Sequence, residues 1–167
     1  LHAGNELLLA CWAETDRTTI VNLTHHAYFN LAGVGDIRRH ELCLQADQFL
    51  PVDACLIPTG EIRPVHGTPM DFSRATRIGI GLNTRYDQII AAGGYDHTWV
   101  LRGPSGSLRR AAQIFEPVSG RSVEIFTTAP GLQFYSGNFL KHTPGRHGAV
   151  YGKHSGLCLE AQHFPDS

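Results

Sequence analysis

The chain has 167 residues, of which 42% are hydrophobic and 17% are charged, and its formal net charge at pH 7 is −1. This length and composition are typical of one globular domain with a buried core. The near-neutral charge, without a basic run, argues against a nucleic-acid partner, and no apolar stretch is long enough to span a membrane. The single methionine is Met70, so we expect a processed chain or a piece of a longer one.

Short runs with strand character follow one another along the whole chain. They are separated by turns rich in glycine and proline, which number 18 and 9. Such spacing is typical of an all-β fold, an antiparallel sandwich or barrel. Residues 87–92 could form one helical turn, and residues 101–110 read as a surface loop. The predicted strands are residues 6–15, 18–31, 41–50, 97–101, 111–115, 122–128, 131–136 and 157–162.

Cysteine usage bears on the compartment. The four cysteines, Cys11, Cys43, Cys55 and Cys158, form no C-x-x-C pair, and most of them lie in apolar or alternating runs. This pattern favours buried free thiols in a cytoplasmic protein over a disulfide framework. Residues 1–10 also lack the basic start of a signal peptide.

The stretch "NLTHHAYFNLAG", residues 22–33, places two histidines side by side. Successive side chains of a strand point to opposite faces. His26 would then share a polar and aromatic face with Tyr28 and Asn30. His25 would share a face with three apolar residues. We therefore expect His25 to pack in the core and His26 to point toward a functional face.

Two further runs carry polar side chains on one face. In "GLQFYSG" Gln133 alternates with apolar neighbours, and in "GLCLEAQHF" Glu160 is the single charge within an apolar run. Polar stripes of this kind often face solvent, which is the simpler interpretation. If the stripes instead meet on one sheet, they form a cavity with an imidazole, a carboxylate and several amides. That set suits a sugar, with one general acid and one general base.

Other chemistries are less well supported. The chain has no H-E-x-x-H zinc motif, no G-x-S-x-G nucleophile turn and no phosphate-binding loop. Three of the ten histidines, His142, His147 and His154, lie in a glycine- and proline-containing segment that reads as a solvated loop. We predict no metal and no cofactor.

Five consecutive motifs point to a known family. They are "ETDRTTIVNLTHHAYFNLAG", "DQFLPVDACLIPTGEIRPVHGTPMDF", "YDHTWVL", "TTAPGLQFYSGNFL" and "GLCLEAQHFPDS". Together, and in this order, they resemble the aldose 1-epimerases, also called galactose mutarotases. The resemblance implies a large antiparallel β-sandwich. It also implies that residues 1–167 form a single partial domain, the C-terminal half of that sandwich, with the N-terminal strands absent.

The resemblance also assigns roles to four positions. It implies that His26 is the general acid toward the ring oxygen and Glu160 the base for the C1 hydroxyl. Asp96, which by itself reads as a turn or cap residue after Gly93-Gly94, matches a sugar-binding carboxylate, and Gln133 matches another sugar-binding position. The implied reaction interconverts the α and β anomers of free hexoses. We expect His26 and Glu160 to stand far enough apart to admit a hexose ring.

Two alternatives to a mutarotase stay open. One is a non-catalytic carbohydrate-binding module on the same fold, and the other is a sugar-phosphate epimerase. A pure binder has no need for an acid and a base together, so the presence of both His26 and Glu160 favours an enzyme. For the isolated chain we expect weak or no activity and self-association through exposed strand edges.

Overall fold

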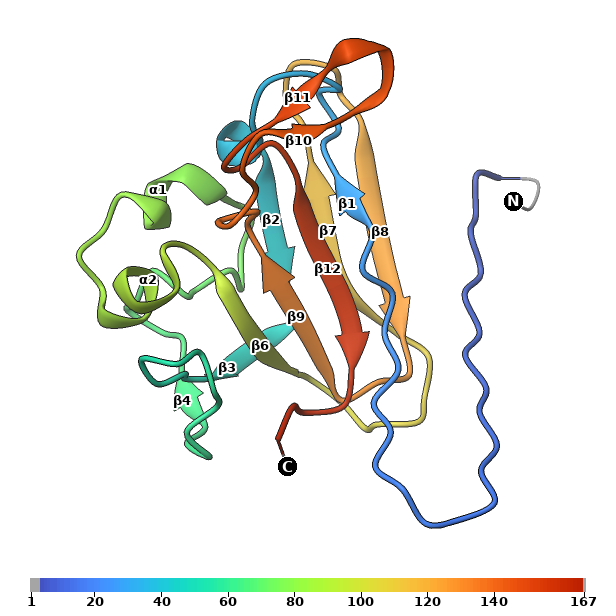
Figure 1. Ribbon diagram of the computed structural model, residues 1–167. Coiled ribbons are helices and arrows are strands. Elements are labelled where there is room, and N and C mark those ends of the chain that lie inside the picture. The colour runs from blue at the N-terminus through green and yellow to red at the C-terminus, as the bar shows by residue number, and fades with distance from the viewer. Residues whose placement is uncertain (1–3, 167) are drawn as a thin grey trace.

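The computed structural model describes residues 4–166 and is built mainly from antiparallel strands (Figure 1). Within these residues the strands form a six-stranded sheet, a four-stranded sheet and a small two-stranded sheet. The six-stranded sheet runs, in spatial order, β1 (Tyr28–Phe29), β12 (Leu157–Gln162), β9 (Gly131–Tyr135), β6 (Asp96–Leu101), β3 (Ala46–Leu50) and β4 (Arg63–Pro64). The four-stranded sheet runs β5 (Thr76–Arg77), β2 (Glu41–Leu44), β7 (Arg109–Phe115) and β8 (Ser122–Thr127). The small sheet pairs β10 (Thr143–Pro144) with β11 (Val150–Tyr151).

Helices are short and lie in the connections. They are α1 (Ile78–Leu82), α2 (Asp87–Ala92) and the 3-10 turns η1 (Ile37–Arg39) and η2 (Arg146–Gly148). The turn expected at residues 87–92 is therefore confirmed as α2, whereas α1 was not foreseen. Among the described residues, no helix has the length and apolar character needed to cross a membrane.

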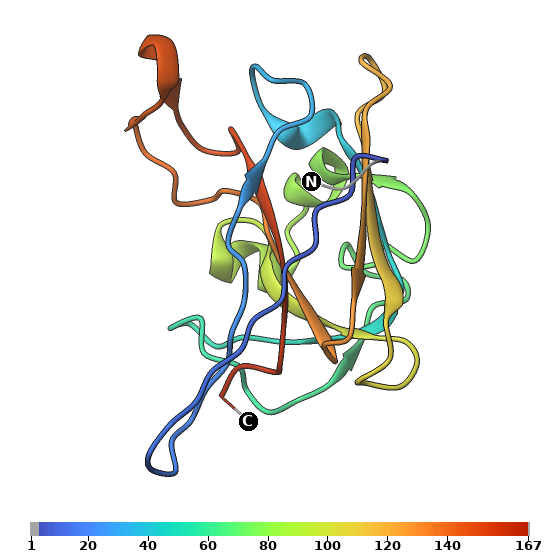
Figure 2. The same ribbon diagram turned by 90° about the vertical axis from the view of Figure 1, so that its right-hand side faces the viewer.

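The two larger sheets lie as separate layers with the hydrophobic core between them (Figure 2). Alternation along each strand explains this arrangement, because every second side chain points inward. Leu132 and Phe134 of β9 and Leu42 and Leu44 of β2 are fully buried. The predicted all-β, antiparallel fold is confirmed.

Aromatic rings fill the middle of the core. Trp99 of β6 is fully buried, and its ring lies 6.0 Å from that of Phe72 and 5.9 Å from that of Phe134. Its indole N–H donates a hydrogen bond of 3.0 Å to the carbonyl of Met70. The polar atom of this large side chain is thus satisfied, as burial requires.

The single strand expected over residues 41–50 is two strands in two different sheets. β2 pairs with β7, whereas β3 pairs with β6. The chain crosses between the layers at Gln45, whose backbone N–H bonds to Ala111 and whose carbonyl accepts from Arg102. An unbroken run of strand-forming residues could not reveal this crossover, because both halves have the same local preference.

Residues 4–27, here called the N-terminal arm, differ most from expectation. The strand predicted at 6–15 is absent, and of that predicted at 18–31 only Tyr28–Phe29 is formed. The arm runs as extended chain beside the body (Figure 1). Local propensity favours extended backbone, but a strand also needs a hydrogen-bonded neighbour, and residues 7–27 of the described chain belong to no ladder.

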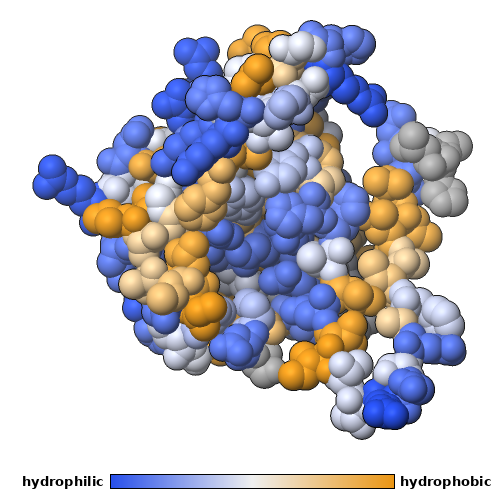
Figure 3. All heavy atoms as spheres, in the orientation of Figure 1, coloured by the Kyte–Doolittle hydropathy of each residue, from blue (hydrophilic) through white to orange (hydrophobic). Residues whose placement is uncertain are grey.

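The predicted burial of His25 is wrong. Phe29 and Leu31, on the same expected face, do pack against the core, but His25 lies in the arm and is exposed. Alternation predicts which side chains share a face, whereas burial also requires an element packed over that face. Apolar residues of the arm are exposed for the same reason, among them Leu8 at 75%, Trp12 at 79% and Ile20 at 98% (Figure 3).

The four cysteines are free, as predicted, but they are not all buried. Cys158 is buried and Cys43 is half-buried, whereas Cys11 and Cys55 are exposed. Cys11 lies in the unpacked arm, and Cys55 lies in the turn that follows β3. The expected burial is therefore wrong for these two.

The two tryptophans allow a matched test of the core. We expect Trp99→Ala to lower the free energy of unfolding by about 3–5 kcal/mol, because it removes a large side chain from a closed core. Trp12→Ala removes the same side chain from an exposed site and should change that free energy by less than about 0.5 kcal/mol. Urea denaturation followed by far-UV circular dichroism measures both. Equal losses in the two variants would contradict the described packing.

Candidate active site

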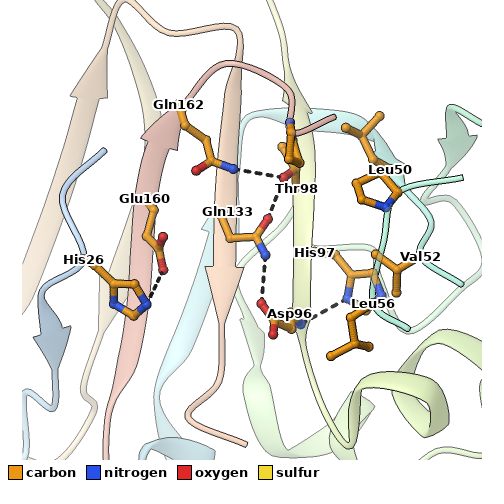
Figure 4. Close-up of a pocket in the computed structure, with 12 residues that line it drawn as sticks. His26, Leu50, Val52, Leu56, Asp96, His97, Thr98, Gln133, Glu160 and Gln162 are labelled. Atoms are coloured by element: carbon orange, nitrogen blue, oxygen red, sulfur yellow. Dashed lines mark hydrogen bonds and ion pairs between the residues drawn. The ribbon is translucent and has the colours of Figure 1, made fainter. Parts of the chain in front are cut away.

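Three neighbouring strands of the six-stranded sheet, β12, β9 and β6, together with the N-terminal arm, bring the predicted site residues to one face. β12 and β9 are in register so that Glu160 lies opposite Gln133. β9 and β6 are in register so that Gln133 lies opposite Thr98. The neighbours of these residues along each strand point into the core, so the polar side chains share the outer face. His26, Asp96, Gln133 and Glu160 all line one pocket of about 220 Å³ (Figure 4).

His26 and Glu160 are in direct contact at the edge of this pocket. β1 pairs with β12 so that Tyr28 lies opposite Cys158. Continuing that antiparallel register two residues back along the chain places His26 opposite Glu160. The imidazole Nε2 lies 3.3 Å from the carboxylate Oε1, and the two side chains are 52% and 9% exposed. The expected gap wide enough for a hexose ring is therefore absent in this structure.

The physical reason for the contact lies in the position of His26 on the arm. Its segment is tethered further back, where the Asn22 side chain exchanges two hydrogen bonds of 3.0 Å with the backbone of His163. Its ring packs at 5.3 Å from that of Tyr28 and at 6.2 Å from that of Tyr135. Held in this way, the imidazole meets the carboxylate that is nearest to it across the strand pair.

Burial and neighbouring charges set the protonation of Glu160. Burial raises the pKa of this carboxyl above its ordinary value, His26 opposes that rise, and the like charge of Asp96 adds to it. A raised pKa makes a carboxylate a stronger base near neutral pH. It also marks the residue as a functional candidate, since partly buried carboxylates are costly unless they are paired or used.

Asp96 and Gln133 belong to a row of hydrogen bonds across three strands. The Gln133 amide nitrogen donates to Asp96 Oδ1 at 2.8 Å, and the Thr98 hydroxyl donates to Gln133 Oε1 at 2.5 Å. Gln162 in turn donates to the Thr98 hydroxyl at 3.5 Å. Burial raises the pKa of Asp96, and the hydrogen bond from Gln133 partly offsets that rise. The row presents fixed, mostly neutral polar groups to the pocket.

Two glycines set where Asp96 begins its strand. Gly93 ends α2 in the left-handed conformation, with φ 64°. A Cβ at Gly94 would collide with the Asn138 side chain. The short turn places Asp96 as the first residue of β6, with its side chain toward the pocket. Asp96 is thus a strand residue that lines the pocket, and not the turn or cap residue that its position after Gly93-Gly94 suggested.

An apolar wall completes the pocket on the side of β3. It consists of Leu50, Val52, Leu56 and Pro58, together with Pro165. Gln88 of α2 holds the loop after β3 in place. Its side chain accepts a hydrogen bond of 2.7 Å from the backbone N–H of Val52 and donates one of 3.1 Å to the carbonyl of Val52. His97 Nδ1 accepts from the Asp96 N–H at 3.1 Å, which leaves Nε2 to donate to Gln88 Oε1, also at 3.1 Å. Burial lowers the pKa of His97 to about 4, so this imidazole is neutral.

Sequence reasoning missed three of these groups. Thr98 could have been found, because it alternates with Asp96 along one strand. His97 and Gln88 gave no signal, since their contact depends on how α2 packs against the sheet.

Comparison with known proteins adds to this geometry. A family model described as aldose 1-epimerase matches residues 1–167. The chain belongs to the aldose 1-epimerase family. Its relatives within the family include human galactose mutarotase, 46% identical over 98% of this chain and 47% of the relative. Aldose 1-epimerase of Escherichia coli K12 is 39% identical, with the same two shares covered.

Solved structures of the family agree in fold. Galactose 1-epimerase from Lactobacillus acidophilus NCFM superposes with a TM-score of 0.73 at 34% identity, covering 87% of this chain and 41% of that one. An aldose epimerase homologue from C. elegans gives a TM-score of 0.74 at 28% identity, covering 85% and 42%. The chain thus spans about half the length of the family members that it matches.

The raised pKa of Glu160 predicts a pH dependence of stability. The folded chain holds this proton to higher pH than the unfolded chain does. Stabilisation by the protonated carboxyl is therefore complete below the unfolded pKa of about 4.3 and is lost as pH rises through the folded pKa. The glutamine of Glu160→Gln cannot ionise, so this variant does not lose stability in this way. Between about pH 4 and pH 7, the stability of the unsubstituted chain should fall relative to that of Glu160→Gln.

Urea denaturation at several pH values measures this difference. Glu14→Gln, which changes an exposed glutamate of the arm, serves as the control. The difference in free energy of unfolding between this variant and the unsubstituted chain should be the same at every pH. If the unsubstituted chain instead gains stability over Glu160→Gln as pH rises, the ion pair with His26 outweighs the cost of burial.

Proposed function

We propose that this chain supplies the acid–base pair of an aldose 1-epimerase, which interconverts the α and β anomers of a hexose such as galactose or glucose. One observation carries the proposal: a member of this family holds an imidazole and a carboxylate 3.3 Å apart at the edge of a polar pocket. A pure sugar-binding module would need the amide row but not this pair. The proposed substrate is a free hexose, and the reaction is redox-neutral, so no cofactor is required.

The proposed reaction starts from ionised Glu160 and protonated His26. Glu160 removes the proton from the C1 hydroxyl while His26 protonates the ring oxygen, and the C1–O5 bond breaks. The open aldehyde rotates about the C1–C2 bond and presents its other face. Ring closure with both proton transfers reversed gives the other anomer and restores both side chains.

Sugar binding requires the two side chains to separate. Glu160 lies on β12, which is paired on both sides, whereas His26 lies on the arm and is half-exposed. The imidazole is therefore the partner that moves, while the carboxylate stays in place. Asp96, Gln133 and Thr98 offer hydrogen-bond partners for the hydroxyls. Leu50 and Val52 offer an apolar surface for the C–H groups of the sugar.

Polarimetry of fresh α-galactose tests the role of Glu160. Because the chain spans about half of its relatives, we would fuse it to the N-terminal half of the Escherichia coli relative. This fusion should accelerate mutarotation above the buffer rate. Glu160→Gln should reduce the enzymatic rate by about 10²- to 10⁴-fold, since it removes a general base.

The 167 residues alone serve as a reference and should run near the buffer rate, because positioning contributes much of a catalysed rate. Glu14→Gln should leave the rate of the fusion unchanged. A folded fusion without activity would overturn the proposed function, and full activity of Glu160→Gln would exclude Glu160 as the base.

We also propose that the isolated chain associates with a second copy through the N-terminal arm. The support is the exposed apolar side chains of the arm, including Leu8 and Ile20, together with backbone groups that pair with no strand.

A cytoplasmic location stays a prediction from the cysteine usage.

Sedimentation velocity at several concentrations tests this association. The unsubstituted chain should form dimers or larger species as concentration rises. Leu8→Asp combined with Ile20→Asp should shift it toward monomer, because charge in the arm opposes apolar contact. Val118→Asp changes another side chain that is 83% exposed but lies outside the arm, and it should have no effect. A monomer at every concentration would contradict the proposal.

A further inference from the structure

Three metal-ligating side chains meet at the edge of the pocket. The ligand atoms of His26, Cys158 and Glu160 all lie within 4.8 Å of one another. Cys158 and Glu160 are two residues apart on β12 and therefore project from the same face. The register that pairs Tyr28 with Cys158 brings His26 to the same place from the arm. Because His26 is far from Cys158 and Glu160 in the chain, no single sequence motif marks this cluster.

The distance between the nitrogen and oxygen ligands of the cluster matches tetrahedral coordination. In such a zinc site, nitrogen and oxygen ligands bind at about 2.0–2.1 Å and so lie about 3.3–3.4 Å from each other. His26 Nε2 and Glu160 Oε1 are 3.3 Å apart. Zinc sites that keep an open position commonly use three protein ligands, with water or substrate as the fourth. Here the fourth position would face the pocket.

Charge favours a cation at this point. Asp96 and Glu160 both line the pocket, and repulsion from the negative charge of Asp96 contributes to the raised pKa of Glu160. Among the described residues that line the pocket there is no lysine or arginine. A divalent ion between His26 and Glu160 would relieve this repulsion.

We propose that His26, Cys158 and Glu160 form a binding site for Zn²⁺ or a similar thiophilic divalent ion, and that the ion blocks the pocket. A thiolate ligand selects Zn²⁺ and Cd²⁺ over Mg²⁺ and Ca²⁺. Burial raises the pKa of the Cys158 thiol to about 12, so the thiol is protonated before the metal binds. Its proton leaves to solvent as the sulfur–metal bond forms. The blocking effect rests on the proposed function, because the ion would occupy the acid and the base. Metal binding itself does not depend on catalysis.

Cd²⁺ titration tests the site directly, because a cadmium–thiolate bond gives a charge-transfer absorption in the near ultraviolet. The probe is a 167-residue chain carrying Cys11→Ser, Cys43→Ser and Cys55→Ser, so that Cys158 is its one cysteine. We expect one Cd²⁺ per chain with this absorption, and no competition by excess Mg²⁺. Adding Cys158→Ser should abolish the absorption.

Two further variants separate a built site from a lone thiol. His26→Gln and Glu160→Gln, each in the single-cysteine chain, should weaken Cd²⁺ binding at least 10-fold while the charge-transfer absorption persists at saturation. Absence of the absorption in the single-cysteine chain, or unchanged affinity in both variants, would overturn the site.

The blocking effect is measured by polarimetry of the fusion protein. Added Zn²⁺ should lower the rate of the unsubstituted fusion. Each protein is compared with its own metal-free rate, and Zn²⁺ should lower the rate of the Cys158→Ser fusion much less. Equal inhibition of both proteins would overturn the blocking role of the site. A fusion without any activity would instead count against the proposed function, and the Cd²⁺ titration would still decide the metal site.

Discussion

The antiparallel register of β12 with its two neighbours is the constraint on which the site depends. On one side it sets Cys158 opposite Tyr28, and on the other it sets Glu160 opposite Gln133. Because side chains alternate with a period of two, a slip of one residue would turn Glu160 into the core and Leu159 out of it. Burial of Leu157 and Leu159 against the second sheet therefore also fixes the direction of the carboxylate.

The same packing gives the site its electrostatic character. A sheet whose inner face is closed by Trp99 and Phe134 leaves little water beneath its outer face, so Asp96 and Glu160 are partly desolvated and their pKa values rise. The hydrogen bond from Gln133 to Asp96 and the contact of His26 with Glu160 offset part of that cost. A carboxylate poised in this way is suited to taking a proton from a hydroxyl, and it is equally suited to holding a cation.

The alternation of polar and apolar residues along the strands predicted much of the site. It separated His26 from His25 and placed Gln133 and Glu160 on one face, and family resemblance supplied Asp96. It failed where structure depends on partners that a local pattern cannot encode. Residues 7–27 of the arm include strand formers but belong to no ladder, so His25 is exposed. The crossover at Gln45 and the Gln88–His97 contact depend on packing between distant segments. The 3.3 Å contact of His26 with Glu160 likewise follows from how the arm is tethered.

We propose that His26 and Glu160 act on the same sugar, His26 at the ring oxygen and Glu160 at the C1 hydroxyl. A crystal structure of the fusion protein with galactose tests it most directly. In that structure we expect the imidazole to have moved away from the carboxylate. The C1 hydroxyl should then lie within about 2.6–3.2 Å of Glu160, and the ring oxygen within the same distance of His26. Galactose bound elsewhere on the sheet, with the 3.3 Å contact of His26 and Glu160 intact, would contradict it.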